Sequence, residues 1–425
     1  MNPLGLIFTV VVCIAVLLLP RRYAFVPVVL AACYITQGQQ YEIMGSHFTA
    51  IRITILFGFL RVVIRKELKQ IEFQLIDKVF ILWVLSGTII YLALWQTGDA
   101  FIYRMGLTYD AILTYFFFRA VFVDLHSVKS TVSILAVIIL PLAVLLLYER
   151  FGLRNVFSFF GAVPEIPMYD GDRIRAMGPF RHPILTGSVG ASLFPLFVAL
   201  GLRRKIIALM GALAAIGIVI SSNSSGPLLS TLCAIFAMAL WPLRDHMRFI
   251  RWGTVTMLVA LHFYMKDPVW YVIARISDIT GGTGWHRSYL IDRAIFYFQD
   301  WWLLGTDNTD HWMPTGLVNI PGADITNQFI YEGVRGGLLT MALFFVLFAV
   351  NFSSVGKRVR AMSDDGLSER FLVWSIGCSL FAHAASFMSV AYFDQSIIFF
   401  YLTLALVGAI SFNKINIAIR KAQVV

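Results

Sequence analysis

Residues 131–148 of this chain read TVSILAVIILPLAVLLLY and contain no charged side chain. A helix of about 20 apolar residues is long enough to cross the hydrocarbon core of a bilayer. Comparable runs recur along the whole chain: 59% of its 425 residues are hydrophobic and the mean hydropathy is +0.77. Soluble domains do not have this composition. The sequence therefore predicts an all-α integral membrane protein.

The apolar runs predict twelve or thirteen transmembrane helices, the first two runs being short. The runs are residues 4–19, 24–38, 48–64, 79–95, 108–123, 131–148, 183–200, 205–220, 226–242, 249–265, 326–350, 371–390 and 395–412. No stretch between them is long enough for a separate soluble domain, so residues 1–425 are expected to form a single polytopic domain. Two connecting segments are long, residues 149–182 and residues 266–325.

Positive charges orient the chain, because Lys and Arg concentrate in cytoplasmic loops. They gather on alternate loops, at Arg21 and Arg22, 65–78, Lys129, 203–205, 244–251, 357–370 and 414–421. That face and the carboxyl terminus are predicted to be cytoplasmic, so both long segments lie outside. The outer cations are arginines, apart from Lys266. Because arginine binds phosphate oxygens in pairs whereas lysine acts as a point charge, this bias indicates phosphate held outside the cytoplasm.

The net charge of +10 is mostly this topology signal, and the sequence shows no basic-aromatic module for nucleic acid. All four cysteines lie in apolar runs, which suggests neither a disulfide framework nor a metal site. No cofactor is predicted. Asp170 and Asp172 flank a glycine, and such carboxylates can hold Mg²⁺ or Mn²⁺ against a diphosphate. A surface turn explains so short a motif more simply.

The first long segment ends in cations beside a predicted helix start. Its last residues are Asp170-Gly-Asp-Arg-Ile-Arg175-Ala-Met-Gly178-Pro-Phe-Arg181-His182-Pro183. Proline suits the first turn of a helix, whose free amides and positive dipole end attract anions. Arg175, Arg181 and His182 are therefore predicted to bind phosphate. Arginines that contact lipid head groups are the simpler alternative.

The second long segment combines a glycine-rich turn at 281–284 with a predicted helix over 287–302. Glycine turns expose backbone amides that can cradle an anion. The mixed aromatic and charged residues of the helix are typical of an amphipathic helix at the membrane interface. Arg287 and Arg293 are predicted phosphate ligands, while the aromatic residues fit simple anchoring at the membrane boundary equally well.

The next predicted span begins after Asp324 and carries Glu332 and Arg335. Residues three apart share a helix face, so this pair is expected to neutralise itself. A charged pair within a span is a functional hypothesis by default, although a structural pair near the membrane edge is an equal alternative. Gly336 and Gly337 would allow close approach of another helix.

Three loose motifs, in this order, resemble the pattern of the O-antigen ligase and polymerase family. They are Arg175-x-x-Gly178-x-Phe180-x-His182-Pro183, the Arg287 segment up to Leu304-Gly305, and Asn327 followed by Glu332-Gly333 and Gly336-Gly337-Leu338. The resemblance covers roughly residues 130–350. It implies a GT-C-like membrane fold in the bacterial inner membrane. It also implies inverting transfer of a glycan from a polyprenyl diphosphate carrier to a hydroxyl acceptor, on the outer side.

The resemblance also implies roles for individual residues. Fixed cations would stabilise charge on the departing diphosphate. The implied donor-binding residues are Arg175, Arg181, His182, Arg287 and Arg293, with Asn327, Glu332 and Arg335 in support. The implied partners are a lipid-linked oligosaccharide, a glycan or lipid acceptor, membrane lipids, and other proteins of polysaccharide assembly or export.

The chain departs from the family at two positions. Members typically place a histidine, the usual candidate base, where this chain has Thr326, and they often carry Ser-Arg-Gly where it has 224–226, Ser-Ser-Gly. The acceptor hydroxyl still needs a positioned base. Asp324 is the first choice because it is the nearest carboxylate, followed by His311 and His286.

Two other functions fit the composition. A flippase would move a lipid-linked glycan without chemistry, but transporters often show paired repeats and ionisable groups near the bilayer centre. This chain has no visible repeat, and its charges cluster at the outer ends and loops, which favours an enzyme. Transfer of one sugar from a polyprenyl monophosphate would need fewer phosphate contacts and ranks below the diphosphate reaction.

Overall fold

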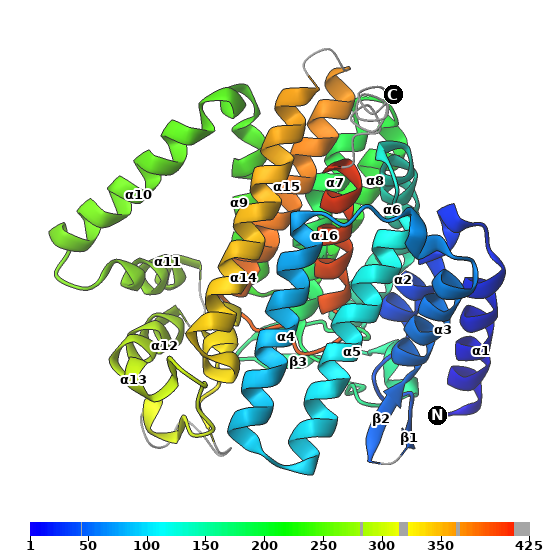
Figure 1. Cartoon of the computed structure of the whole chain (residues 1–425), viewed down its shortest axis with the longest axis horizontal. Helices are drawn as coiled ribbons and strands as arrows, with labels where there is room; N and C mark the ends of the chain where they lie inside the picture. The colour runs from blue at the N-terminus through cyan, green and yellow to red at the C-terminus, as the bar shows by residue number, and fades with distance from the viewer. Residues whose placement is uncertain (44, 281–283, 314–321, 363–365, 412–425) are drawn as a thin grey trace, which may run out of the picture.

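The structure, a computed structural model of the chain, describes residues 1–43, 45–280, 284–313, 322–362 and 366–411. It is 77% helical with almost no sheet (Figure 1). The α-helices are α1 Pro3–Leu18, α2 Phe25–Tyr34, α3 Ala50–Ile64, α4 Leu75–Trp95, α5 Gly98–Val121, α6 Leu125–Gly152, α7 Pro183–Leu200, α8 Lys205–Ser222, α9 Ser225–Ala239, α10 Met247–Tyr264, α11 Val272–Thr280, α12 Gly284–Phe296, α13 Phe298–Trp301, α14 Gln328–Ala361, α15 Leu367–Phe387 and α16 Ile397–Ser411.

The remaining elements are short. The 3-10 helices are η1 Arg21–Tyr23, η2 Glu67–Gln70, η3 Val156–Phe160, η4 Trp241–His246, η5 Val269–Tyr271 and η6 Asp310–Trp312. The strands β1 Gln40–Ile43 and β2 Ser46–Thr49 form one antiparallel hairpin, and β3 Met168–Asp170 and β4 Arg173–Arg175 form another. In the second hairpin Asp170 pairs with Arg173 across the turn.

Each of the predicted apolar runs contains a helix, and the run 183–200 coincides with α7. Within the described residues, α4, α6, α7, α8 and α14 are long and apolar enough to cross a membrane. The pair of α9 with Trp241–Tyr264, bent by 76°, is either a sixth, broken span or a re-entrant loop. The ten residues of α2 rise only about 15 Å, half of the hydrocarbon thickness. Several helices that could cross a membrane are thus present, as predicted, and the count of twelve or thirteen stays a prediction.

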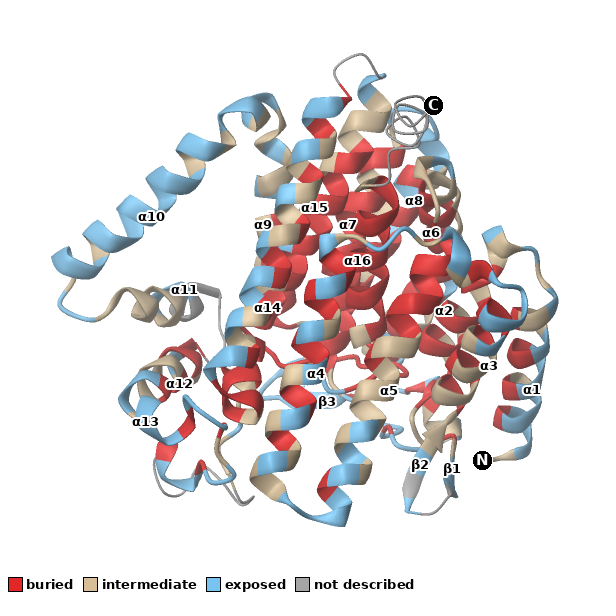
Figure 2. Ribbon diagram, viewed as in Figure 1, coloured by how far each residue is buried: buried red, intermediate tan, exposed pale blue. Residues whose placement is uncertain are grey.

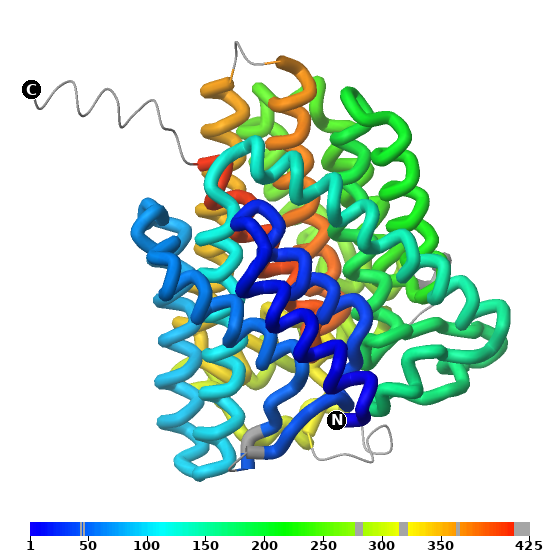
Figure 3. Tube along the Cα trace, turned by 90° about the vertical axis from the view of Figure 1, so that its right-hand side faces the viewer, coloured from blue at the N-terminus to red at the C-terminus, as the bar shows by residue number. Residues whose placement is uncertain are grey.

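The two predicted outer segments share one end of the helix bundle. Both hairpins, α12 and α13 lie at this end, and the end of α14 and the start of α15 lie at the other (Figure 1). The side view shows α1, α2 and α3 as a layer on one flank (Figure 3). The helix predicted over 287–302 is observed as α12 and α13, interrupted at Tyr297. We call the end with the hairpins the outer end, after the predicted orientation.

Helix α7 lies in the core and packs against α8, α9 and α15 (Figure 2). It is 89% buried. A Cβ at Gly190 would lie 2.6 Å from the carbonyl oxygen of Ala215, so this contact with α8 requires glycine. The helix begins at Pro183, as predicted, with His182 as its N-cap. The core therefore fixes the position of a helix start at the outer end.

Helix α10 is the opposite case, since none of its residues is buried (Figure 2). It follows a sharp bend after α9 and leaves the bundle. Its exposed side chains include Phe249, Trp252 and Phe263. An exposed helix with this composition suits contact with lipid.

Glycines join the outer segment to α14. Gly337 has a φ of 67° and interrupts α14, and a Cβ there would clash with the carbonyl oxygen of Leu303. Gly305 has a φ of 80°, and a Cβ there would clash with the carbonyl oxygen of Val334. We expected the glycine pair of α14 to admit another helix. Gly337 instead admits the backbone of the loop that follows α13.

Candidate functional site

Arg175, the last residue of β4, lies against the start of α9. Its Nη2 donates to Ser224 Oγ at 2.9 Å, and its Nη1 lies 3.1 Å from Asp170 Oδ2. The backbone N–H of Ala176 donates to the Ser221 carbonyl oxygen at 3.0 Å, which ties the strand to the end of α8. Arg175 is 8% exposed, whereas the Asp170 side chain is 59% exposed. The guanidinium group is therefore buried and its carboxylate partner is not.

Arg287 reaches the same helix start from α12. It is 5% exposed. A Cβ at Gly226, the second residue of α9, would lie 3.9 Å from Arg287 Nη2 and 2.5 Å from Ser389 Oγ. A larger residue at 226 would therefore fill the space between Arg287 and Ser389, which glycine leaves open.

His182 contributes a neutral donor. Its Nδ1 accepts a hydrogen bond from the backbone N–H of Ile184 at 3.2 Å, so in the neutral ring the proton is on Nε2. Burial, and then the charge of Arg175, lower the pKa of His182 to about 4. Near neutral pH the ring is therefore uncharged and offers one N–H close to Arg175.

Arg175, His182 and Arg287 form what we call the cation cluster. Burial and the charge of Arg175 lower the pKa of Arg287, so the two guanidinium groups repel each other. Within the described residues, Asp170 is the one carboxylate paired with either arginine. Ser224, the N-cap of α9, makes no side-chain cap hydrogen bond, so the positive end of this helix adds to the field. The cluster favours a bound anion.

The loop from β4 to α7 is held by a buried carboxylate. Glu149, on α6, accepts hydrogen bonds from the backbone N–H groups of Met177 at 2.9 Å and Gly178 at 2.8 Å. Asn155 Nδ2 donates to the Gly178 carbonyl oxygen at 3.0 Å. Gly178 has a φ of 59°, which glycine adopts without strain. The spacing between Arg175 and His182 therefore depends on Glu149.

His182 is expected to contribute stability that is lost as the pH falls below 6.5. The pKa of His182 is about 4 in the folded state and 6.5 ordinarily, so between these values the unfolded chain binds a proton that the folded chain does not. Stability present above pH 6.5 is then lost towards pH 4. The melting temperature of His182→Asn, which keeps a capping side chain, should vary less with pH over this window. Identical pH profiles for the two proteins would contradict the assignment.

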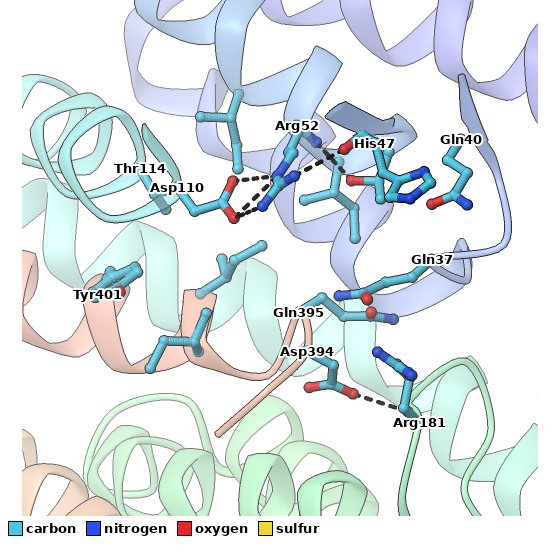
Figure 4. A pocket seen from close by; sticks show the side chains of 15 residues that line it. Gln37, Gln40, His47, Arg52, Asp110, Thr114, Arg181, Asp394, Gln395 and Tyr401 are labelled. Carbon is cyan, nitrogen blue, oxygen red and sulfur yellow. Dashed lines mark hydrogen bonds and ion pairs between the residues drawn. The ribbon is translucent and has the colours of Figure 1, made fainter. Parts of the chain in front are cut away.

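Two predicted phosphate ligands lie outside the cluster. Arg181 is exposed and lines a separate pocket, while its backbone N–H donates to Asp394 Oδ2 at 2.9 Å (Figure 4). Arg293 lies 3.2 Å from Asp292 Oδ2 and over the rings of Tyr289 and Phe296. Arg181 lies in the bend before α7, outside both strands. Arg293 lies further along α12 than Arg287, and residues on different faces of a helix diverge. Local geometry therefore separates both arginines from the cluster.

Asn327 is linked to the cluster through the connection between α15 and α16. It caps α14, and its Nδ2 lies 3.9 Å from Met388 Sδ. The next residue, Ser389, faces Gly226. The start of α14 thus lies beside the start of α9 in the folded chain.

Sequence reasoning missed the connection over residues 388–396. Besides Ser389, it supplies Asp394 and Gln395, both buried. Gln395 Nε2 donates to the Pro179 carbonyl oxygen at 2.8 Å, and Asp394 accepts from the backbone N–H of Arg181. These contacts hold the loop before α7. The polar residues 394–396, at the boundary of the predicted run 395–412, were the available signal.

The three candidate bases have different surroundings. His286 Nε2 lies 3.1 Å from the Asp324 carbonyl oxygen, so in the neutral ring Nε2 carries the proton and Nδ1 carries the lone pair. The Asp324 residue is exposed. His311 Nε2 lies 3.3 Å from Asp300 Oδ2. Thr326, which replaces the family histidine, has a buried hydroxyl with no hydrogen-bond partner among the described residues.

Glu332 and Arg335 do not form the expected ion pair within the described structure. Glu332 Oε2 accepts from Trp83 Nε1 at 3.0 Å, and Oε1 accepts from Gln328 Nε2 at 2.7 Å. Arg335 Nη1 lies 3.3 Å from the Tyr91 hydroxyl, and its guanidinium lies over aromatic rings. Other side chains satisfy each group, so a shared helix face did not produce a contact.

Some predictions fall on residues outside the described ranges. These are the glycine turn at 281–283 and the carboxyl-terminal charges at 414–421. Within the described ranges, no three side chains of His, Cys, Asp or Glu gather as metal ligands would. Gly171 lies at the turn between β3 and β4. The side chain of Asp170, beside it, forms an ion pair with Arg175.

Neither a scan against protein-family models nor a search of curated proteins finds a match for this chain. The resemblance drawn from the motifs is therefore still a prediction. A function has to be argued from the chemistry of the site, because a fold class alone does not imply one.

Proposed function

We propose that the protein is a membrane glycosyltransferase that moves a glycan from a polyprenyl diphosphate to a hydroxyl acceptor at the outer end. The supporting observation is the meeting of Arg175 and Arg287, 8% and 5% exposed, at the start of α9. Asp170 neutralises Arg175, but no carboxylate among the described residues pairs with Arg287. Burying a cation without neutralising it is costly, so an anion is expected to complete the cluster. A diphosphate offers adjacent anionic groups with oxygens that guanidinium groups bind in pairs.

In the proposed reaction the acceptor oxygen attacks the anomeric carbon on the face opposite the diphosphate. A new C–O bond forms, the bond to the diphosphate oxygen breaks, and its electron pair leaves with the diphosphate. Arg175 and Arg287 would neutralise the growing charge, and His182 Nε2–H would donate to a phosphate oxygen. Two fixed cations and a helix start supply the positive charge that a divalent cation provides in many diphosphate sites. We expect activity without added metal.

We favour His286 as the base that takes the acceptor proton. The Asp324 carbonyl oxygen fixes the tautomer in which Nδ1 is free. Asp324, the first choice from sequence, then acts as a positioning residue through its backbone. His311 is already engaged by Asp300.

Glycan transport without chemistry is the alternative. Transporters commonly hold their substrate near the bilayer midplane between two halves of the molecule. The cation cluster lies at the outer end, among the loops and the starts of α7 and α9. This position favours a reaction at one face over passage through the bundle.

The direct test uses the full-length protein in lipid nanodiscs with an undecaprenyl-diphosphate oligosaccharide and a panel of glycan and lipid acceptors. Mass spectrometry is expected to show a joined glycan and a released carrier diphosphate, with and without EDTA. NMR of the product should show an inverted anomeric configuration. Unchanged donor with every acceptor, together with transport of the lipid across vesicles, would establish the flippase instead. Loss of product in EDTA would point to a metal at Asp170 and Asp172.

A further inference from the structure

A pocket at the outer end is lined by residues that do not include Arg175, His182 or Arg287 of the cation cluster (Figure 4). Its volume is about 230 Å³, and it lies between the β1–β2 hairpin, α3, α5 and the start of α16. One part of its lining is polar, with Gln37, Gln40 and Thr114 among its residues. Ile55 and Tyr401 contribute an apolar part. The pocket thus combines hydrogen-bonding groups with apolar surface.

The charges of this pocket are balanced. Arg52 donates to both carboxylate oxygens of Asp110, through Nε at 2.9 Å and Nη2 at 2.7 Å, and its Nη1 donates to the His47 carbonyl oxygen at 2.8 Å. Asp394 accepts hydrogen bonds from the backbone N–H groups of Arg181 and Ser396, and it lies beside Arg181 in the pocket (Figure 4). Two carboxylates therefore accompany two guanidinium groups. This balance disfavours a phosphate and suits a neutral guest.

Two buried polar atoms of the lining are unsatisfied. Thr114 Oγ1 and Gln395 Oε1 have no hydrogen-bond partner in the described part of the chain. The amide nitrogen of Gln395 is already engaged, since it donates to the carbonyl oxygens of Ile35 and Pro179. Buried polar atoms are almost always paired, so each orphan implies a missing partner. Both atoms are covered in this structure, so a guest with hydroxyl groups would pair with them as the Thr114 and Gln395 side chains turn toward it.

We propose that this pocket binds one neutral sugar residue of the acceptor glycan. Sugar hydroxyls match the polar lining, and the C–H face of a sugar ring matches Tyr401 and the neighbouring isoleucines. The sugar attached directly to the donor diphosphate must stay beside Arg175 and Arg287, neither of which lines the pocket. The inference rests on the proposed function, because an acceptor exists only if the protein transfers a glycan.

The two sites share two segments of chain, which places the acceptor next to the donor. Arg181 lines the pocket, and His182, the next residue, belongs to the cation cluster. Ser389 faces the cluster, and Asp394 of the same connection lines the pocket. A glycan that enters the pocket is thereby brought to the loop that carries the donor-binding residues.

Binding is tested first without donor. Saturation-transfer NMR would measure the binding of methyl glucoside, methyl galactoside and methyl N-acetylglucosaminide to the full chain in nanodiscs. Loss of one hydrogen bond in Thr114→Val is expected to weaken the best of them about tenfold. Thr54→Val is the matched control, because Thr54 on α3 donates to the Ala50 carbonyl oxygen and does not line the pocket. Equal binding by wild type and Thr114→Val would overturn the pocket assignment.

Steady-state transfer then separates acceptor from donor. Thr114→Val is expected to raise the KM for the acceptor about tenfold and to leave the KM for the donor unchanged. A rise in the donor KM alone would overturn the acceptor assignment. Wild-type transfer with unaltered acceptor KM in Thr114→Val would sink the inference and leave the proposed function intact. Sugar binding that depends on Thr114, without transfer by the wild type, would refute the proposed function and the acceptor role with it.

Discussion

Arg287→Ala is expected to reduce the rate of glycan transfer about 100- to 1000-fold, the usual effect of removing one fixed donor that stabilises transition-state charge. Arg287 is 5% exposed, and its field adds to that of Arg175. The loss should appear in kcat at saturating donor and acceptor, since the charge develops as the diphosphate departs. Arg287→Lys keeps the charge but not the planar fork, so it should retain part of the rate.

The control for this substitution is Arg275→Ala. Arg275 belongs to the same outer segment, but its side chain is 61% exposed and lies 3.5 Å from Asp267. Its replacement should leave transfer unchanged. The melting temperature separates a binding role of Arg287 from a structural one. Because Arg287 is buried and its charge is repelled by that of Arg175, the melting temperature of Arg287→Ala should equal or exceed that of the wild type. A lower melting temperature with retained transfer would show that Arg287 is structural.

Glu149→Ala is expected to destabilise the fold by about 2 to 6 kcal/mol, because each of two buried backbone N–H groups loses its acceptor at a cost of about 1–3 kcal/mol. The carboxylate is 1% exposed and bonds to Met177 and Gly178. Transfer should fall too, since these residues join β4 to α7. Thermal unfolding in detergent and the transfer assay measure the two effects.

Glu165→Ala is the comparison for Glu149→Ala. Glu165 lies 3.0 Å from Arg154, and both side chains are mostly exposed, so the pair contributes less than about 1 kcal/mol. Its removal should leave the melting temperature near that of the wild type. If Glu149→Ala behaves in the same way, the carboxylate does not hold the loop.

The helices were predictable because helix-length apolar runs are local features of the chain. The run 183–200 coincides with α7, whose proline at the first position marks its start. The number of spans was less predictable. Helix α2 was expected over 24–38 and has ten residues, because an apolar run does not reveal where the backbone leaves the helix.

The candidate site was predictable in part. Arg175, His182 and Arg287 come together, as the motifs suggested, around the start of α9. Arg181 and Arg293 do not join them, because Arg181 lies in an irregular bend before α7 and side-chain direction on α12 depends on the helix face. The expected ion pair of Glu332 with Arg335 also fails, since partners from α4, distant in sequence, compete for both groups.

Composition alone predicted a helical protein with membrane-length apolar helices, and such helices are present. It could do so because the partition of a side chain between lipid and water depends on that side chain and its near neighbours. The assignment of the loops to two faces is a prediction of the same kind. Three-dimensional packing selected which arginines converge, placed Ser389 beside them, and built the pocket around Thr114 and Gln395. These contacts join residues far apart in the chain. No local pattern encodes such contacts, since they form only when separate helices pack together.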